Sequence, residues 1–129
     1  LGAHRELPGT VDADGAFRAP GLAGAFPALG SDERPVRAGP AVAACRPDAV
    51  QLVRASGHAP AAQAVTAAAT AAARVVAVRH HARGATARVA LDGAPGVTLD
   101  AAVAAHDPPA VGEAVHAVLD APRVPVYPA

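Results

Sequence analysis

Apolar positions recur at helical spacing in several stretches of the chain, and these stretches predict short helices. Leu22, Phe26 and Leu29 fall three or four residues apart after Pro20, a residue that suits the first turn of a helix. A second apolar face follows in 48–55, and Gly57 is a typical stop after it. Further helices are expected over three ranges: the Ala-rich 61–73, 98–105 with Thr98 as N-cap, and 110–119.

Runs rich in Val, or with alternating polarity, predict strands between these helices. The ranges 74–79 and 85–91 are expected to pair as a hairpin around 80–84, and 34–37 is expected to be a short buried strand. The last strand, over 123–127, should lie at a sheet edge because Pro125 has no N–H to donate. Asp and Gly clusters at 12–15 and 92–96 predict turns.

Strands alternating with helices indicate an α/β protein with a small, partly parallel sheet flanked by helices. A length of 129 residues indicates one domain over 1–129. Its first part, 1–58, should hold the sheet and helices. Its second part, 59–129, should hold the Ala-rich helix, the hairpin and two short helices.

Composition limits both stability and partners. The hydrophobic fraction is 52%, but most of it is Ala and Val, so each buried residue removes little apolar area from water. Eleven basic and eleven acidic residues give no net charge, so we expect no nucleic-acid or membrane partner. The absence of Ile, Lys and Asn suggests very GC-rich coding DNA. Such DNA can also encode chains rich in Ala, Arg, Pro and Gly that have not been selected for a function, so this alternative stays open.

The location expected from the sequence is the cytoplasm. A single cysteine, Cys45, excludes an internal disulfide, and no basic region followed by an apolar run marks a secretory signal. The most apolar run, 59–73, is too short and too polar to span a bilayer, so we expect a soluble protein. No cofactor is expected.

The best candidate site is the stretch 36–45, which is predicted to run from a strand through a small-residue loop into a helix. Small residues let a backbone approach a ligand closely, and the N–H groups of such a loop can bind an anion. The predicted anion- or ligand-binding residues are Ala38, Gly39, Ala41, Val42 and Ala43.

Residues 7–58 resemble a rhodanese-like sulfurtransferase domain, in particular the second half of mercaptopyruvate or thiosulfate sulfurtransferases. The matching features are Leu7-Pro8-Gly9, 12–18, the predicted helix with Leu22 and Phe26, Arg34-Pro35-Val36, 38–43 and Gly57-His58. In that family a nucleophilic cysteine begins a loop of the type Cys-Gly-Ser-Gly-Val-Thr, where converging N–H groups favour a thiolate and its persulfide.

On that loop Ala38 takes the place of the nucleophile, Gly39 and Val42 keep their positions, and Pro40 replaces the serine. The resemblance therefore implies a non-catalytic rhodanese-like domain whose loop binds a small anion or a partner. An alternative is an unrelated small interaction or structural domain with no chemistry. A third is an active sulfurtransferase that acts through Cys45, which would lie in the helix beyond the loop.

Other combinations of chemical groups favour structural roles. His80 and His81 lack the spacing to each other, or to His58, His106 or His116, that places two metal ligands on one face, so no metal site is expected. Asp100 with Glu113, and His106 with Asp107, are interpreted as solvated charges on predicted helices. The arginines at 74, 79, 83 and 88 concentrate positive charge, and Arg74 and Arg88 would share one face of the hairpin and attract anions.

Overall fold

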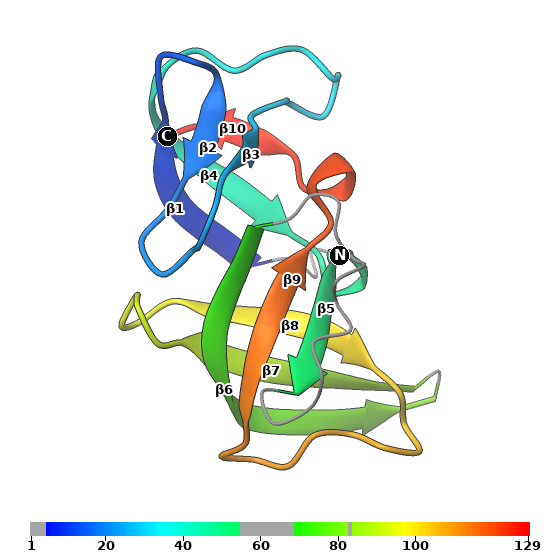
Figure 1. Ribbon diagram of the computed structural model, residues 1–129. Helices are drawn as coiled ribbons and strands as arrows, with labels where there is room; N and C mark the ends of the chain where they lie inside the picture. Colours follow the sequence, from blue (N-terminus) through cyan, green and yellow to red (C-terminus); the bar gives the residue numbers. More distant parts are fainter. Residues whose placement is uncertain (1–4, 55–68, 83) are drawn as a thin grey trace.

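The computed structural model describes residues 5–54, 69–82 and 84–129, which form ten β-strands and two short 3₁₀ turns (Figure 1). The strands build two five-stranded antiparallel sheets, which lie one above the other in the view of Figure 1. Within these ranges the architecture is therefore all-β.

The first sheet has the strand order β10-β4-β1-β2-β3. Its strands are β1 (Arg5–Val11), β2 (Ala16–Arg18), β3 (Phe26–Pro27), β4 (Gly39–Cys45) and β10 (Val126–Pro128). β1 and β4 pair along their whole length, from Arg5 opposite Cys45 to Val11 opposite Gly39. The C-terminal strand β10 closes one edge of this sheet against β4.

The second sheet has the order β5-β9-β6-β7-β8. Its strands are β5 (Val50–Arg54), β6 (Ala69–His81), β7 (Gly84–Leu91), β8 (Thr98–Val103) and β9 (Ala114–Leu119). The sheet curls, so that β8 lies near β5 and near the 3₁₀ turn η1 (Pro47–Ala49). A second 3₁₀ turn, η3 (Ala121–Arg123), precedes β10.

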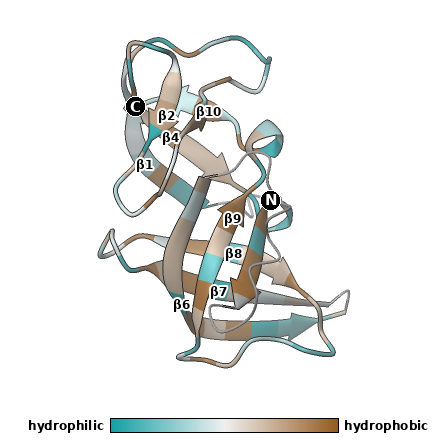
Figure 2. Cartoon of the chain, viewed as in Figure 1, coloured by the Kyte–Doolittle hydropathy of each residue, from teal (hydrophilic) through white to brown (hydrophobic). Residues whose placement is uncertain are grey.

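Alternation of buried and exposed positions explains why these segments are strands. Every second residue of β7, from Ala85 to Leu91, is buried, and its neighbours on the strand are half-buried. The first half of β6 has the same period, with Ala69, Ala71 and Ala73 inside. Figure 2 shows the resulting hydrophilic and hydrophobic bands along the second sheet. A period of two residues matches the pleat of a sheet that buries one face.

One apolar cluster includes residues from both sheets. Its largest members come from the first sheet, where the rings of Phe17 and Phe26 lie 5.4 Å apart, and from the second sheet, where Leu99 and Leu119 are buried. Much of the remaining core is Ala and Val. Each buried methylene-sized group adds about 0.8 kcal/mol to the stability of the fold. Because most core side chains here are small, the stability of the core depends on close packing of many side chains rather than on a few large ones.

The contact between β1 and β2 depends on a glycine. A Cβ atom on Gly9 would lie 2.3 Å from the carbonyl oxygen of Arg18 and 2.6 Å from the ring of Phe17.

The turn that follows β1 is held by Asp12, whose Oδ1 accepts hydrogen bonds from the backbone N–H groups of Asp14 and Ala16 at 2.9 and 3.1 Å. Asp12 Oδ2 accepts a hydrogen bond from Nε of Arg18, and this hydrogen bond lowers the pKa of Asp12. The turn predicted at 12–15 is thus confirmed.

The α/β fold with a parallel sheet flanked by helices is wrong. The range expected to be a helix at 98–105 contains β8, and the one at 110–119 contains β9. Most of 48–55 is η1 and β5, and 20–29 holds turns and β3. Residues 61–68 lie outside the described residues, whereas 69–73 belong to β6. Packing between two sheets overrides the helix preference of Ala, which is a weak force for each residue.

Two predictions of strands hold and one fails. The hairpin is confirmed as β6 and β7. A closing strand at the edge of the first sheet is also confirmed, but β10 begins at Val126 and not at 123, which belongs to η3. The range 34–37 is not a strand, because only Pro35 forms an isolated bridge, to Leu29. The turn predicted at 92–96 is confirmed and links β7 to β8.

Candidate functional site

The stretch expected to hold an anion-binding loop is a strand in this structure. Ala38 precedes β4, while Gly39, Ala41, Val42 and Ala43 lie within it. β4 pairs with β1 on one side and with β10 on the other. A strand inside a sheet uses its N–H groups in the two ladders. These residues therefore lie in a strand and not in a loop, and anion binding by them stays a prediction.

Cys45 closes β4 and is buried, with no exposed surface. Its Sγ lies 4.0 Å from the carbonyl oxygen of Ala43. Burial raises the pKa of the Cys45 thiol to about 12, because a thiolate would lose its hydration there. A reactive cysteine needs the opposite setting, with exposure and a lowered pKa.

The remaining candidate groups are placed apart. Asp100 is bound by arginines, as described below, and the side chain of Glu113 accepts a hydrogen bond from the N–H of Ala110 in a turn. His106 and Asp107 lie in the segment between β8 and β9. Across the described ranges, no three histidine, cysteine or acidic residues gather as a metal site would require, and His58 lies outside those ranges.

The structure does gather charged groups on the outer face of β6, β7 and β8. In the register of the sheet, Arg79 on β6 lies opposite Thr86 on β7. Arg88, also on β7, lies opposite Asp100 on β8. These residues line a hollow of about 350 Å³. Its full lining is Pro47, Ala77, Arg79, His81, Thr86, Arg88 and Asp100, and we call it the arginine hollow.

A β-bulge brings these arginines to one face. The register between β6 and β7 shifts between Val75 and Ala77, so Val76 is an extra residue in β6. A bulge bends its strand, and β6 is bent in Figure 1. Strict alternation would place Arg74 and Arg79, five residues apart, on opposite faces. With the extra residue both lie on the face of Arg88. The predicted shared face of Arg74 and Arg88 is thus present, although Arg74 donates to the carbonyl oxygen of Gly112 at 2.8 Å.

Asp100 is the centre of the charge network around the arginine hollow. Its Oδ1 accepts a 2.9 Å hydrogen bond from Nε of Arg88, and its Oδ2 lies 3.6 Å from Nε of Arg5 on β1. The hydrogen bond from Arg88 to Asp100 raises the pKa of Arg88. His81 Nε2 lies 3.1 Å from Thr86 Oγ1 at the other end of the hollow. Among the described residues Arg79 has no ion-pair partner.

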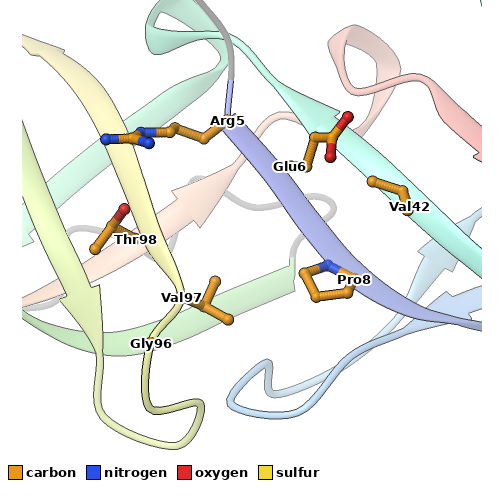
Figure 3. Close-up of a pocket in the computed structure, with 7 residues that line it drawn as sticks. All are labelled: Arg5, Glu6, Pro8, Val42, Gly96, Val97 and Thr98. Carbon is orange, nitrogen blue, oxygen red and sulfur yellow. The ribbon is translucent and has the colours of Figure 1, made fainter.

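A second surface lies on the outer face of the first sheet. One hollow, of about 570 Å³, runs between β1 and the start of β8 and is lined by Arg5, Glu6, Pro8, Val42, Gly96, Val97 and Thr98 (Figure 3). Another, of about 600 Å³, continues over β4 and β10 and is lined by Glu6, Ser31, Val42, Ala44, Arg46, Pro125, Tyr127 and Pro128. Glu6 and Val42 belong to both, so the two form one groove, which we call the sheet groove.

No local pattern in the sequence marks Asp100, Thr86 or His81 as neighbours of the arginines. The helix expected at 98–105 does not place Asp100 opposite Arg88, whereas strand β8 does. A hairpin across the turn at 92–96 would have revealed that pair, since antiparallel strands around a turn place residues opposite each other in a fixed register.

No protein-family model matches the chain, and no curated protein has a significant match to it. The resemblance of residues 7–58 to rhodanese-like domains therefore stays a prediction. Over the described ranges, no helical segment has the length and apolar character needed to cross a lipid bilayer.

Proposed function

We propose that this protein is a binding domain, and that its arginine hollow takes a small oxyanion group of a partner molecule, a carboxylate or a phosphate. The observation that carries the proposal is the convergence of Arg79 and Arg88 on one hollow of about 350 Å³. A guanidinium group offers a planar set of N–H donors that matches the geometry of both oxyanions.

Charge and hydrogen-bonding capacity support this assignment. Two arginines face one carboxylate, Asp100, which Arg5 also shares, so positive charge is in excess within the hollow. Arg88 uses its Nε on Asp100 and keeps its terminal N–H groups for a ligand. Thr86 and His81 add further hydrogen-bonding groups at the opposite end.

The excess is local, because the chain as a whole has no net charge. A local cluster of positive charge favours a small anionic group over a long polyanion such as a nucleic acid, which would contact a wide basic surface.

Replacement of Arg79 tests the proposal. Isothermal titration with inorganic phosphate, and separately with acetyl-aspartate, distinguishes the two sources of the oxyanion. We expect Arg79→Gln to weaken binding of the preferred ligand by about five- to tenfold, as for the loss of one partly exposed charged contact.

The matched control is Arg34→Gln. Arg34 is an arginine outside the hollow whose side chain is 85% exposed. We expect this variant to bind within about twofold of the wild type, since no hollow contact is removed. Binding of neither ligand, or equal loss in both variants, would contradict the proposal.

A further inference from the structure

The sheet groove is a second concave surface, whose lining residues differ from those of the arginine hollow. Figure 3 shows that Arg5 extends toward β8, while Glu6, the next residue of β1, lies toward β4 and Val42. The two side chains leave β1 on opposite sides, because successive residues of a strand alternate. Of these two side chains, Arg5 lines only the hollow next to β8, whereas Glu6 lines both hollows of the groove.

Each arginine at the groove is directed to a carboxylate elsewhere. Arg5 Nε lies 3.6 Å from Asp100 Oδ2, and Arg46 Nε lies 3.9 Å from Asp48 Oδ1. By contrast, no residue of the described ranges forms an ion pair with Glu6. The charge left to attract a ligand at the centre of the groove is thus negative.

The rest of the lining is largely apolar and includes the chain's only tyrosine. Tyr127 is 43% exposed and shares a hollow with Glu6. Pro8, Val42 and Val97 add apolar surface along the length of the groove. A cation near the face of an aromatic ring and close to a carboxylate is attracted by both. An extended chain can contact apolar side chains in succession along such a surface.

We propose that the sheet groove binds an extended peptide segment that carries one arginine or lysine, with the cation placed between Glu6 and Tyr127 and the flanking residues on the apolar lining. Charge complementarity to Glu6 selects this occupant over an acidic segment. It also selects it over a lipid surface, which would require basic rather than acidic groups.

Tyrosine emission measures occupancy of this groove directly, because the chain has one tyrosine and no tryptophan. The probe is the blocked peptide Ala-Pro-Val-Arg-Val-Pro-Ala, which has no aromatic residue. We expect a saturable change of Tyr127 emission with the Arg peptide, and binding weaker by about tenfold for the same peptide with Glu in place of Arg.

Substitution of Glu6 completes the test. Glu6→Gln keeps the shape of an exposed side chain, and we expect it to weaken binding of the Arg peptide by about five- to tenfold. Asp14→Asn, at an exposed carboxylate in the β1–β2 turn outside the groove, is the matched control and should leave binding unchanged. Far-UV circular dichroism and a thermal melt check that both variants fold.

Three results with the peptides would each overturn the proposal: an emission that does not change with the Arg peptide, equal affinity for the Arg and Glu peptides, or equal affinity in Glu6→Gln and wild type. A change of emission with protein concentration alone would indicate a second copy of the chain as the occupant and would also overturn it. Phosphate titrations of the arginine hollow do not enter this test, so the two proposals fail separately.

Discussion

Burial of the Cys45 thiol makes the stability of the fold depend on alkaline pH. Burial raises the pKa of this thiol from about 9.0 to about 12. Below about pH 9 the thiol is protonated in both the folded and the unfolded chain, and its contribution to stability is complete. Above that pH the unfolded chain loses the proton first, so the free energy of unfolding decreases until the folded thiol also ionises.

The size of this loss follows from the difference between the two pKa values. A difference of about three units corresponds to about 4 kcal/mol at the alkaline end of the window. At about pH 10.5, some 1.5 units above the unfolded pKa, the loss is about 2 kcal/mol. This is a large part of the total stability of a domain, which is about 5–15 kcal/mol.

Urea unfolding measured by circular dichroism at about pH 8 and about pH 10.5 tests this reasoning, with Cys45→Ala as the comparison. Other groups that titrate affect both proteins, so the difference between them isolates the thiol. We expect the wild type to lose about 2 kcal/mol more than the variant, or about 1 M in the urea midpoint at a slope of about 2 kcal/mol per M. Equal losses would show that Cys45 is not buried as described.

The same burial bears on sulfur transfer. A thiol without exposed surface cannot reach thiosulfate in the folded state, so we expect no thiocyanate above the background of the Cys45→Ala variant when the protein is incubated with thiosulfate and cyanide. Turnover that disappears in Cys45→Ala would establish the sulfurtransferase alternative instead.

Two further substitutions test the packing and the charge network. Gly9→Ala should lower the free energy of unfolding by about 2–3 kcal/mol, because the new Cβ meets the backbone of Arg18. The change Thr10→Ala, at the neighbouring exposed residue, should lower it by less than about 0.5 kcal/mol. Urea unfolding compares the two variants, and equal effects would contradict the close contact at Gly9. Asp100→Asn should lower the free energy of unfolding by about 1 kcal/mol, since Arg5 and Arg88 lose a partly exposed ion-pair partner. The same variant should bind phosphate a few-fold more tightly, because Asp100 competes with phosphate for Arg88. Weaker phosphate binding would refute this competition.

The hairpin and the turns were predictable because their signals are local. Val75, Val78 and Val89 favour strands, and Asp14-Gly15 and Asp92-Gly93 mark the turns at 12–15 and 92–96. The helices expected at 69–73 and at 98–105 are strands for a different reason. In β6 both faces carry Ala, so the period of two residues that would reveal a strand is hidden, and the helix preference of Ala is misleading.

The candidate site shows the same division. Arg74 and Arg88 on one face followed from the predicted hairpin. The inclusion of Arg79 depends on the bulge at Val76, and the sequence around it, Val75-Val76-Ala77, has no Gly or polar residue to mark a bulge. Small residues predict an anion-binding loop at 38–43, but most of these residues lie in β4, which pairs with β1 and β10.

The most direct test of the proposed function is a phosphate titration followed by amide chemical shifts in a ¹H–¹⁵N spectrum. It locates the anion without any substitution. We predict that the largest shifts fall on Arg79, Thr86 and Arg88, around the arginine hollow, and that Gly39 and Ala41 in β4 shift little. The proposal would be contradicted if the shifts were confined to β4. It would also be contradicted if no amide shifted when the phosphate concentration was raised to that of the salt in the buffer.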